Sequence, residues 1–440
     1  MILRGGIVIT NNPRREILHD RAIRVSGAIV EALLPAATLP ASEEVVDCSG
    51  MVIVPGFVQT HIHLCQTLFR GLADEFELLD WLQQRIFPFE AAHNERSMNA
   101  SAMLGIAELI RSGTTAILDM GSLHHEEEII RAVGETGLRA HVGKAMMDVN
   151  DAFPGLREST KESIRATRAL AERWHGSYDG RVRYAPAPRF VLSCSEEVMR
   201  FAGEMVASHE GMIFHTHASE NAREVETVRR LFGKENLELL DSYSVISGRS
   251  CLAHCVHIGK RELDILAAKG SAVAHCPSSN LKLASGIADV PALLARGIRV
   301  GLGADGAPCN NSLDMFQEMR LASLLQKLKH GATAMPAAKV FEMATLGGAA
   351  ALGLDREIGS IEAGKKADLV LLNLGTVWNP PGGNLYSSIV YSSHPENVDS
   401  VMIDGKWIYR HGEFTEMDAE RIVAEGTSEL KLLLGRIRRD

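Results

Sequence analysis

Two His-x-His motifs constrain this chain more than any other feature of its sequence. The first closes the apolar stretch that begins at Pro55 and ends in His61 and His63. Because side chains alternate between the two faces of a strand, both imidazoles point the same way. Imidazole is the commonest protein ligand for a transition metal, so the end of this predicted strand can hold one ion. Such a pair can also arise by chance among 17 histidines, and matching residues elsewhere in the chain decide between the two interpretations.

The middle of the chain alternates predicted strands with helical segments. The clearest helix runs from Met98 to Arg111, and Ser112-Gly113 predicts its end. Eight alternations over roughly 300 residues favour a (β/α)8 TIM barrel, with a doubly wound sheet as the alternative. No Gly-x-Gly-x-x-Gly follows an early strand, which disfavours the dinucleotide-binding version of that sheet. The strands are expected near residues 57–63, 114–119, 138–146, 181–187, 211–217, 249–255, 271–275 and 298–303.

Both ends of the chain show a different pattern, with short predicted strands separated by turns. We therefore expect a small β-sandwich domain built from both termini, residues 1–55 and 366–440, around a barrel domain of residues 56–365. The terminal strands are expected at residues 6–10, 21–25, 51–54, 367–372 and 398–403, and a final helix at about residues 417–436.

Composition disfavours several classes of protein. Hydrophobic residues make up 46% and charged residues 23% of the chain, which is ordinary for a soluble globular enzyme. The net charge of −9 disfavours a nucleic-acid partner, and no apolar run is long enough to span a membrane. The N-terminus lacks the pattern of a signal peptide. Seven dispersed cysteines are typical of a cytosolic protein, so we predict a cytoplasmic location.

Further polar residues stand at the ends of later predicted strands, where a TIM barrel carries its active site. The fifth strand ends in the second motif, His215-x-His217, and Glu220 follows it. The sixth strand contains His254, and the eighth ends in Asp305. Each residue has a structural alternative, such as a hydrogen-bonded histidine or an Asp-Gly turn. Taken together, in order and at one edge of the barrel, they predict a metal site.

The chain resembles the amidohydrolase superfamily, in the branch that holds methylthioadenosine/S-adenosylhomocysteine deaminases, guanine deaminases and triazine hydrolases. The resemblance covers nearly the whole chain, and its motifs are specific for the branch rather than for a substrate. These motifs are Pro55 to Gln66, Arg70 to Asp74, Leu78 to Leu82, His217 to Glu220, His275 to Asn280, Gly303 to Gly306 and Gly359 to Leu369.

The resemblance implies one divalent metal ion, zinc or in some members iron. His215 and His217 face the same way, and the branch places an acid three residues after the ligand, which favours His217 because Glu220 is there. Two-metal relatives use a bridging lysine on the fourth strand, and residues 181–187 contain none, although Lys144 on the third strand keeps that alternative open. The implied ligands are His61, His63, His217 and Asp305.

The same resemblance implies the chemistry. When bound, a divalent cation lowers the pKa of water from about 15.7 towards roughly 7, which supplies a nucleophile at neutral pH. Glu220 is expected to shuttle a proton from the water to a ring nitrogen, His254 to hydrogen-bond the water, and Asp305 to accept a proton. His124-x-Glu126 matches half of the motif of unrelated zinc deaminases, but no Pro-Cys-x-x-Cys follows, so we interpret it as a loop segment.

Four residues are predicted to bind the substrate. Trp81 is expected to wall the pocket, and Gln66 to hydrogen-bond a purine edge. Glu90 matches a position that binds the ribose hydroxyls in nucleoside-deaminating relatives. Arg189 stands where methylthioadenosine-type deaminases usually have a histidine, and resembles guanine deaminases instead; its alternative is a structural salt bridge. The segment that follows Asp305 is more similar to that of adenosine-type deaminases, so Arg189 and this segment point to different substrates.

The resemblance thus predicts a metal-dependent deaminase of an aminopurine, with an adenosine-type nucleoside such as 5′-deoxyadenosine, methylthioadenosine or S-adenosylhomocysteine as the first choice. A guanine-type base deaminase and a triazine amino- or chlorohydrolase are the enzymatic alternatives. A non-catalytic barrel would lack a ligand or the acid, and all of them are present in the sequence. The expected partners are a small-molecule substrate and further copies of the chain in a homo-oligomer.

Overall fold

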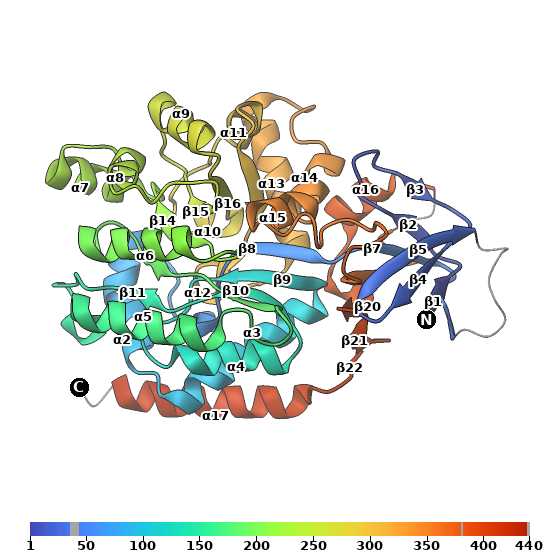
Figure 1. Ribbon diagram of the computed structural model, residues 1–440, viewed down its shortest axis with the longest axis horizontal. Coiled ribbons are helices and arrows are strands. Elements are labelled where there is room, and N and C mark those ends of the chain that lie inside the picture. The colour runs from blue at the N-terminus through green and yellow to red at the C-terminus, as the bar shows by residue number, and fades with distance from the viewer. Residues whose placement is uncertain (36–43, 380–381, 438–440) are drawn as a thin grey trace.

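A parallel sheet wrapped by helices forms the larger part of the computed structural model, which describes residues 1–35, 44–379 and 382–437 (Figure 1). Eight strands follow one another in the order β12-β10-β9-β8-β17-β16-β15-β14, and every pair in this series is parallel. Their bounds are β8 (Phe57–His63), β9 (Thr114–Asp119), β10 (Arg139–Val142), β12 (Val182–Tyr184), β14 (Phe214–Ala218), β15 (Ser250–His254), β16 (Ala272–His275) and β17 (Arg299–Leu302).

The two outer strands of this series meet and close the barrel. The segment that follows β12 continues as β13 (Ala187–Pro188), which pairs with β11 (Ala145–Met146). Beside it, the backbone N–H of His215 in β14 donates to Pro186 O at 3.3 Å, and that of His217 donates to Arg189 O at 3.0 Å. The (β/α)8 barrel expected from the alternation of strands and helices is therefore confirmed, with each predicted strand in its place.

Glycine allows β17 to lie close against β8. A Cβ atom added at Gly303, directly after β17, would lie 2.7 Å from His61 O and 2.8 Å from His61 N, closer than real Cβ contacts. The chain then continues as β18 (Asp305–Gly306), which pairs with Ile62 and His63 of β8. The small residue thus brings the carboxylate of Asp305 beside the histidines of β8.

Strands from both ends of the chain form two further sheets that pack on each other as a sandwich. Residues of both sheets, among them Leu3, Ile23, Ile53 and Leu371, share one buried apolar cluster. The boundaries 1–55, 366–440 and 56–365 stay a prediction, and they include residues 36–43, 380–381 and 438–440 outside the described part. One sheet runs β5 (Ile29–Pro35), β4 (Arg21–Ser26), β1 (Ile2–Arg4) and β6 (Val45–Asp47); the other runs β22 (Glu413–Phe414), β21 (Lys406–Arg410), β20 (Val398–Ile403), β19 (Leu369–Asn373), β7 (Met51–Pro55), β2 (Ile7–Ile9) and β3 (Ile17–Leu18).

Helices cover the outside of the barrel. Helix α3 begins at Glu95, three residues before the predicted start, because the Asn94 side chain accepts a hydrogen bond from Ser97 N at 2.9 Å and caps the helix. The larger helices are α3 (Glu95–Arg111), α4 (Glu126–Glu135), α5 (Thr160–Trp174), α6 (Glu196–Ser208), α7 (Ala222–Phe232), α8 (Asn236–Ser242), α9 (Lys260–Lys269), α13 (Met315–His330), α14 (Ala337–Met343) and α17 (Ala419–Ile437). Shorter ones are α10 (Pro277–Lys282), α11 (Val290–Ala295), α12 (Ala307–Asn310), α15 (Leu346–Ala351) and α16 (Leu385–Ser387).

A helical segment between β8 and α3 covers the carboxyl ends of the barrel strands. It consists of η2 (Leu64–Phe69), α1 (Leu78–Trp81), η3 (Leu82–Ile86) and α2 (Phe87–Ala91). Its apolar side chains share a cluster with Leu123, Met147 and Leu156 from the loops above the strands. Arg223 pairs with Glu77 and Asp80 of this segment. The segment is thereby held over the mouth of the barrel.

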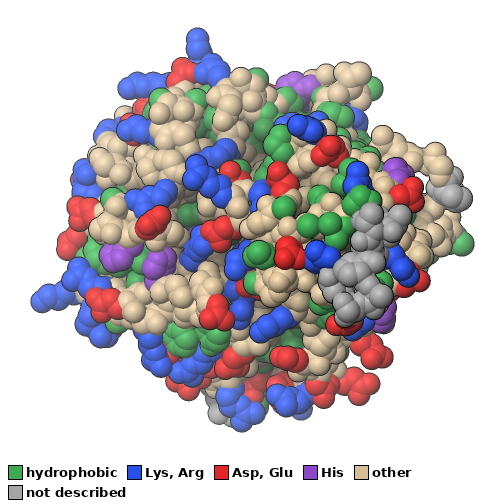
Figure 2. Space-filling view, turned by 45° about the vertical axis from the view of Figure 1, so that its right-hand side comes forward, with side chains coloured by type: hydrophobic (Ala, Val, Ile, Leu, Met, Phe, Trp, Pro, Cys, Tyr) green, Lys and Arg blue, Asp and Glu red, His purple; other side chains and the backbone are tan. Residues whose placement is uncertain are grey.

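The surface of the described part is mixed in character. Acidic and basic side chains are interspersed over the face shown in Figure 2. Among the helices of the described residues, none combines the length and the apolar character needed to cross a membrane.

Candidate metal centre

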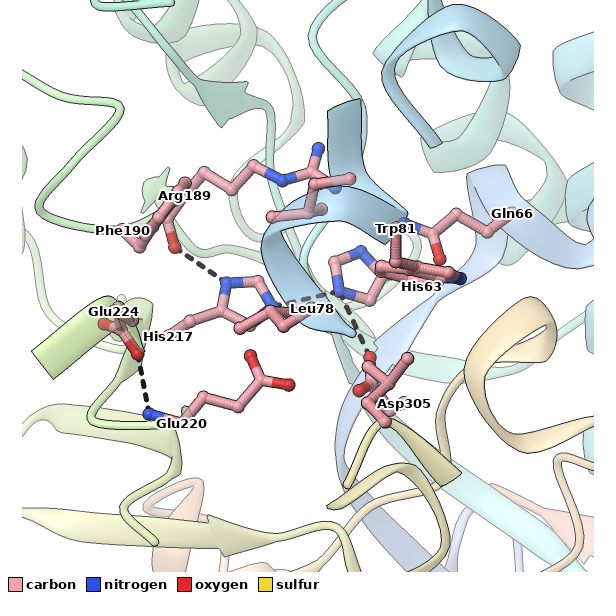
Figure 3. Close-up of a pocket in the computed structure, with 12 residues that line it drawn as sticks. His63, Gln66, Leu78, Trp81, Arg189, Phe190, His217, Glu220, Glu224 and Asp305 are labelled. Carbon is pink, nitrogen blue, oxygen red and sulfur yellow. Dashed lines mark hydrogen bonds and ion pairs between the residues drawn. The ribbon is translucent and has the colours of Figure 1, made fainter. Parts of the chain in front are cut away.

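Four predicted ligands from three strand ends meet in the mouth of the barrel. One ligand atom from each of His61, His63, His217 and Asp305 lies within 4.8 Å of all the others. The two histidines of β8 and the aspartate are buried, and His217 is half-buried at the pocket. Figure 3 shows His63 and His217 facing each other, with Asp305 beside His63. The nearest nitrogens of these two rings, both Nε2, are 3.2 Å apart.

A backbone carbonyl determines which nitrogen of His217 faces the centre. Its Nδ1 lies 2.7 Å from Arg189 O (Figure 3). A carbonyl oxygen can only accept, so Nδ1 carries the hydrogen and donates it. The Nε2 atom of His217 therefore presents a lone pair to the centre, which is the form in which a neutral imidazole binds a metal.

A second pair of histidines fixes His61 in the same way. The Nδ1 atom of His215 lies 2.7 Å from Cys251 O and donates to it. The Nε2 atom of His215 then accepts from His61 Nδ1, 2.8 Å away. This leaves a lone pair on His61 Nε2, which has no hydrogen-bond partner among the described residues. His215 thus lies behind His61 and outside the ligand cluster, and orients the ring as outer partners of metal ligands do.

The resulting donor set fits a divalent cation. His61 Nε2, which bears the lone pair, lies 3.2 Å from Asp305 Oδ1, and His63 Nε2 lies 3.4 Å from the same oxygen. Two electron-rich atoms buried at this distance repel each other unless a positive charge lies between them. Three imidazoles and one carboxylate are ligands that zinc and similar ions accept.

Glu220 and His254 stand next to the cluster. His254 Nε2 lies 3.5 Å from Glu220 Oε2 and 3.8 Å from Asp305 Oδ2, and its Nδ1 pairs with Asn280 Oδ1 at 2.9 Å. Burial lowers the pKa of His254 to about 4, so its ring is neutral at physiological pH. Glu224 accepts a hydrogen bond from Glu220 N at 2.8 Å and holds the loop in place.

The two carboxylates of the site have opposite pKa shifts. Burial, followed by the charge of Asp305, raises the pKa of Glu220 well above its usual value. Burial also acts to raise the pKa of Asp305, but the positive charge that the neighbouring imidazoles, His61 first, carry when they are protonated holds it well below its usual value. Glu220 therefore keeps a proton at a pH where Asp305 is ionised.

A pocket opens beside the cluster. Three of the four predicted substrate residues line it, namely Gln66, Trp81 and Arg189. Trp81 Nε1 and Gln66 Oε1 are buried and have no hydrogen-bond partner among the described residues. The full lining is His63, Gln66, Leu78, Trp81, Leu82, Arg189, Phe190, His217, Glu220, Glu224, Leu283 and Asp305.

Glu90 does not belong to this lining. Its carboxylate accepts hydrogen bonds from Arg189 Nη1 at 2.7 Å, Arg189 Nη2 at 3.0 Å and Gln66 Nε2 at 2.8 Å. The Arg189 guanidinium also lies over the Phe87 ring, 5.3 Å from its centre. The structure thus shows Arg189 both in a buried salt bridge and at the pocket, and places Glu90 behind the two residues that face the cavity.

Several pocket residues were missed from the sequence. Leu78, Leu82, Phe190 and Leu283 are apolar residues of loops and short helices, and nothing in their spacing distinguishes them from core residues. Asn280 was seen as part of a motif, but its partner His254 is 26 residues away and the pair is visible only in the fold.

The remaining candidates lie outside the cluster. Lys144 Nζ donates to Ala145 O at 3.0 Å and pairs with Glu158, so it does not bridge two ions here. Glu126, the first residue of α4, accepts from Ser122 N in the preceding loop, as expected for a structural residue. His275 in β16 is buried, and neither ring nitrogen has a hydrogen-bond partner within the described ranges.

Comparisons with known proteins agree with this geometry. A model of the amidohydrolase family matches residues 52–408. A 5'-deoxyadenosine deaminase from Methanothermobacter thermautotrophicus is 42% identical over 383 residues, which cover 87% of this chain and 87% of the relative. A 5-methylthioadenosine/S-adenosylhomocysteine deaminase from Moorella thermoacetica is 38% identical over 400 residues, 90% of this chain and 91% of the relative. The crystal structure of an adenosine deaminase from Xanthomonas campestris with bound zinc is 33% identical and has a TM-score of 0.91, over 100% of this chain and 98% of that chain. The chain belongs to the amidohydrolase family.

Proposed function

We propose that this protein is a metal-dependent deaminase that hydrolyses the amino group from an adenosine-type nucleoside, such as 5′-deoxyadenosine, methylthioadenosine or S-adenosylhomocysteine. The observation that carries the proposal is the position of Glu220, a buried carboxyl that lines the same pocket as the ligand cluster and whose pKa burial raises well above its usual value. The substrate class rests on the similarity to deaminases of 5'-deoxyadenosine and of 5-methylthioadenosine/S-adenosylhomocysteine.

His61, His63, His217 and Asp305 are the proposed ligands of one divalent ion. We propose zinc, because the relative from Xanthomonas campestris was solved with bound zinc. When bound, such an ion acts as a Lewis acid and makes water a competent nucleophile near neutral pH. The location of Lys144 in an ion pair with Glu158 favours one ion over two.

Glu220 is the proposed proton donor. Attack of water on the amine-bearing carbon breaks the aromaticity of the ring, and the adjacent ring nitrogen must gain a proton as it does so. The carboxyl of Glu220 holds that proton because burial raises its pKa. After giving it up, the carboxylate can take the remaining proton of the added hydroxyl as the carbonyl forms, which restores Glu220 to its starting state.

His254 and Asp305 are proposed to act on the water. The neutral ring of His254 has its Nδ1 engaged with Asn280, which leaves Nε2 free between Glu220 and Asp305. From there it can hydrogen-bond the water and orient it. Asp305 can accept the proton that the water loses on attack and pass it to the leaving amine, so that ammonia departs and Asp305 is ionised again.

The pocket offers an apolar slot with polar groups at one end. The side chains of Leu78, Leu82 and Leu283 suit the faces of a purine ring. The unpaired Trp81 Nε1–H and Gln66 Oε1 supply one donor and one acceptor for its edge or for the sugar. These contacts fix the orientation of the substrate towards Glu220.

The sequence predicts that Glu90 binds a ribose hydroxyl, but its place behind Gln66 and Arg189 favours a role in positioning these two side chains for the substrate. A carboxylate has about four lone-pair directions, and Arg189 and Gln66 use three of them. The same ion pair supports a second candidate function, a guanine-type base deaminase, because Arg189 lines the pocket and Glu90 does not.

Ammonia release tests the proposal. The zinc-loaded protein is incubated with 5′-deoxyadenosine, methylthioadenosine, S-adenosylhomocysteine, adenosine, guanine and melamine in separate assays. Turnover of the nucleosides with little or none of guanine supports the proposal. Activity on guanine alone favours the second candidate, activity on melamine alone a triazine-type hydrolase, and no activity on any of them contradicts the deaminase proposal.

A further inference from the structure

The C-terminal helix ends beside η2 and α2, which carry Gln66 and Glu90 of the substrate side of the pocket. Helix α17 leaves β22 next to the sandwich and runs along the outside of the barrel to α2 (Figure 1). Leu433, which is fully buried, shares an apolar cluster with Leu68, Phe69 and Phe89. Leu68 and Phe69 belong to η2, which contains Gln66, and Phe89 precedes Glu90 in α2.

Arg436, in the last turn of α17, makes polar contacts to the same region. Its Nε donates to Ala92 O at 2.6 Å, and its Nη2 donates to Ser97 Oγ at 3.1 Å. Ala92 is two residues after Glu90 and caps the end of α2. One guanidinium therefore binds both the end of α2 and the start of α3.

Ser97 and His93 connect Arg436 to the backbone of η2. His93 Nε2 lies 2.8 Å from Cys65 O and must donate to it, so His93 Nδ1 accepts from Ser97 Oγ, 3.0 Å away. Ser97 Oγ in turn accepts from Arg436. The relay ends at Cys65, the residue directly before Gln66.

We propose that Arg436 is a positioning residue for the substrate side of the pocket. It holds the backbone next to Gln66 and the backbone next to Glu90. The Gln66 side chain donates a hydrogen bond to Glu90, and Glu90 also accepts one from Arg189. The metal ligands lie on β8, β14 and β18, and within the described ranges none of them is hydrogen-bonded to Arg436, Ser97 or His93. This role rests on the proposed function, because it takes Gln66, Glu90 and Arg189 as the substrate-side group.

The variant Arg436→Met tests the role, since methionine keeps most of the aliphatic stem and removes every donor. We expect KM for 5′-deoxyadenosine to rise on the order of tenfold, the size of effect typical of residues that act through a contact network. The kcat value is expected to stay within about twofold and zinc content to stay unchanged, because a loss of substrate binding alone raises KM. Arg436→Lys keeps one donor and should restore part of the affinity.

A matched control removes a different polar contact of the same helix. Arg96 Nε lies 3.1 Å from Glu429 Oε1 and ties α3 to α17 outside the relay. Arg96→Met should leave KM, kcat and zinc content at wild-type values. A second test combines Arg436→Met with Gln66→Ala: if Arg436 acts through Gln66, the two effects on KM should be clearly less than additive in free energy.

Three results would overturn the inference. An unchanged KM in Arg436→Met would do so, and so would a parallel fall of kcat, zinc content and thermal stability, which indicates a purely structural contact. An equal rise of KM in Arg96→Met would assign the effect to helix docking. If the wild type released no ammonia from any nucleoside, the proposed function itself would be contradicted, and the role of Arg436 with it. If the wild type is active, the results for the variants test the role of Arg436 alone.

Discussion

At the scale of single residues, the site separates two carboxyl groups that lie in one cavity. Asp305 is surrounded by imidazoles and stays ionised, whereas Glu220 is buried among apolar and acidic neighbours and keeps its proton. Environments that push two pKa values apart assign one group to accept protons and the other to donate them. This contrast carries the proposed roles of the two residues.

Replacing Glu220 by glutamine removes the proton donor and keeps the shape of the side chain. We expect Glu220→Gln to bind zinc as the wild type does and to lose roughly 10²- to 10⁴-fold in kcat, the usual contribution of acid–base catalysis. Zinc content by atomic absorption and ammonia release with 5′-deoxyadenosine check this. Wild-type turnover in the variant would contradict the role proposed for Glu220.

The two histidines of β14 are expected to respond differently to alanine. His217→Ala removes a ligand and should abolish stoichiometric zinc binding. His215→Ala removes the partner of His61 Nδ1 and should weaken zinc binding by about 10- to 100-fold without abolishing it, as is typical for outer partners of ligands. Zinc titration against a competing chelator measures both affinities, and the reverse order would make His215 the ligand.

At the scale of elements, α13 places the buried carboxyl of Glu318 beside α10 and α12. Glu318 accepts hydrogen bonds from Ser278 N at 3.2 Å, in α10, and from Asn310 Nδ2 at 2.9 Å, in α12. Burial raises its pKa to about 7 despite these bonds. Two short helices, α10 and α12, are thus joined to α13 at one carboxyl that prefers to be protonated.

This preference predicts how stability depends on pH. The folded pKa of Glu318 lies above the unfolded value, so the folded state loses stability as pH rises from about 4.5 to about 7, by on the order of 3 kcal/mol in total. Glu318→Gln removes this dependence. We expect its thermal midpoint, relative to wild type, to be higher at pH 8 than at pH 5.

The exposed Glu420→Gln is the control, and its midpoint should follow the wild type at both pH values. A difference between Glu318→Gln and wild type that is the same at pH 5 and pH 8 would contradict a raised pKa for Glu318.

At the scale of the whole molecule, one buried arginine joins the barrel to the sandwich. Arg139 at the start of β10 donates from Nε and Nη2 to Asp368 at 2.9 and 3.1 Å, and from Nη2 to Asp404 at 2.6 Å. Asp368 precedes β19, and Asp404 stands in the turn between β20 and β21. These two elements come from the far end of the chain.

Arg139→Met leaves two buried carboxylates without their main partner. Because breaking a buried ion pair from one side leaves uncompensated charge, we expect the free energy of unfolding to fall by about 3–5 kcal/mol. Arg165→Met breaks an exposed pair with Glu162 and should change it by less than about 1 kcal/mol. Urea unfolding at 25 °C measures both, and similar values for the two variants would contradict this connection.

The sequence by itself determined the order of the barrel strands and the residues that meet at their ends. Alternation with period two places His61 and His63 on one face, and the expected strands near 57–63 and 298–303 appear as β8 and β17. The strand bounds and the face of each side chain depend on residues close together in the chain, which is why a pattern reveals them, and the barrel topology then brings the strand ends together.

The tertiary structure alone decided how those residues pair. The hydrogen bonds that fix His217 and His61 come from Arg189 O and from His215, the latter 154 residues from its partner. Arg189 and Glu90, which form an ion pair, are 99 residues apart in the sequence, and Arg436 and Ala92 are 344 residues apart. No local pattern encodes such contacts, because they exist only once the barrel has closed and the last helix has docked on it.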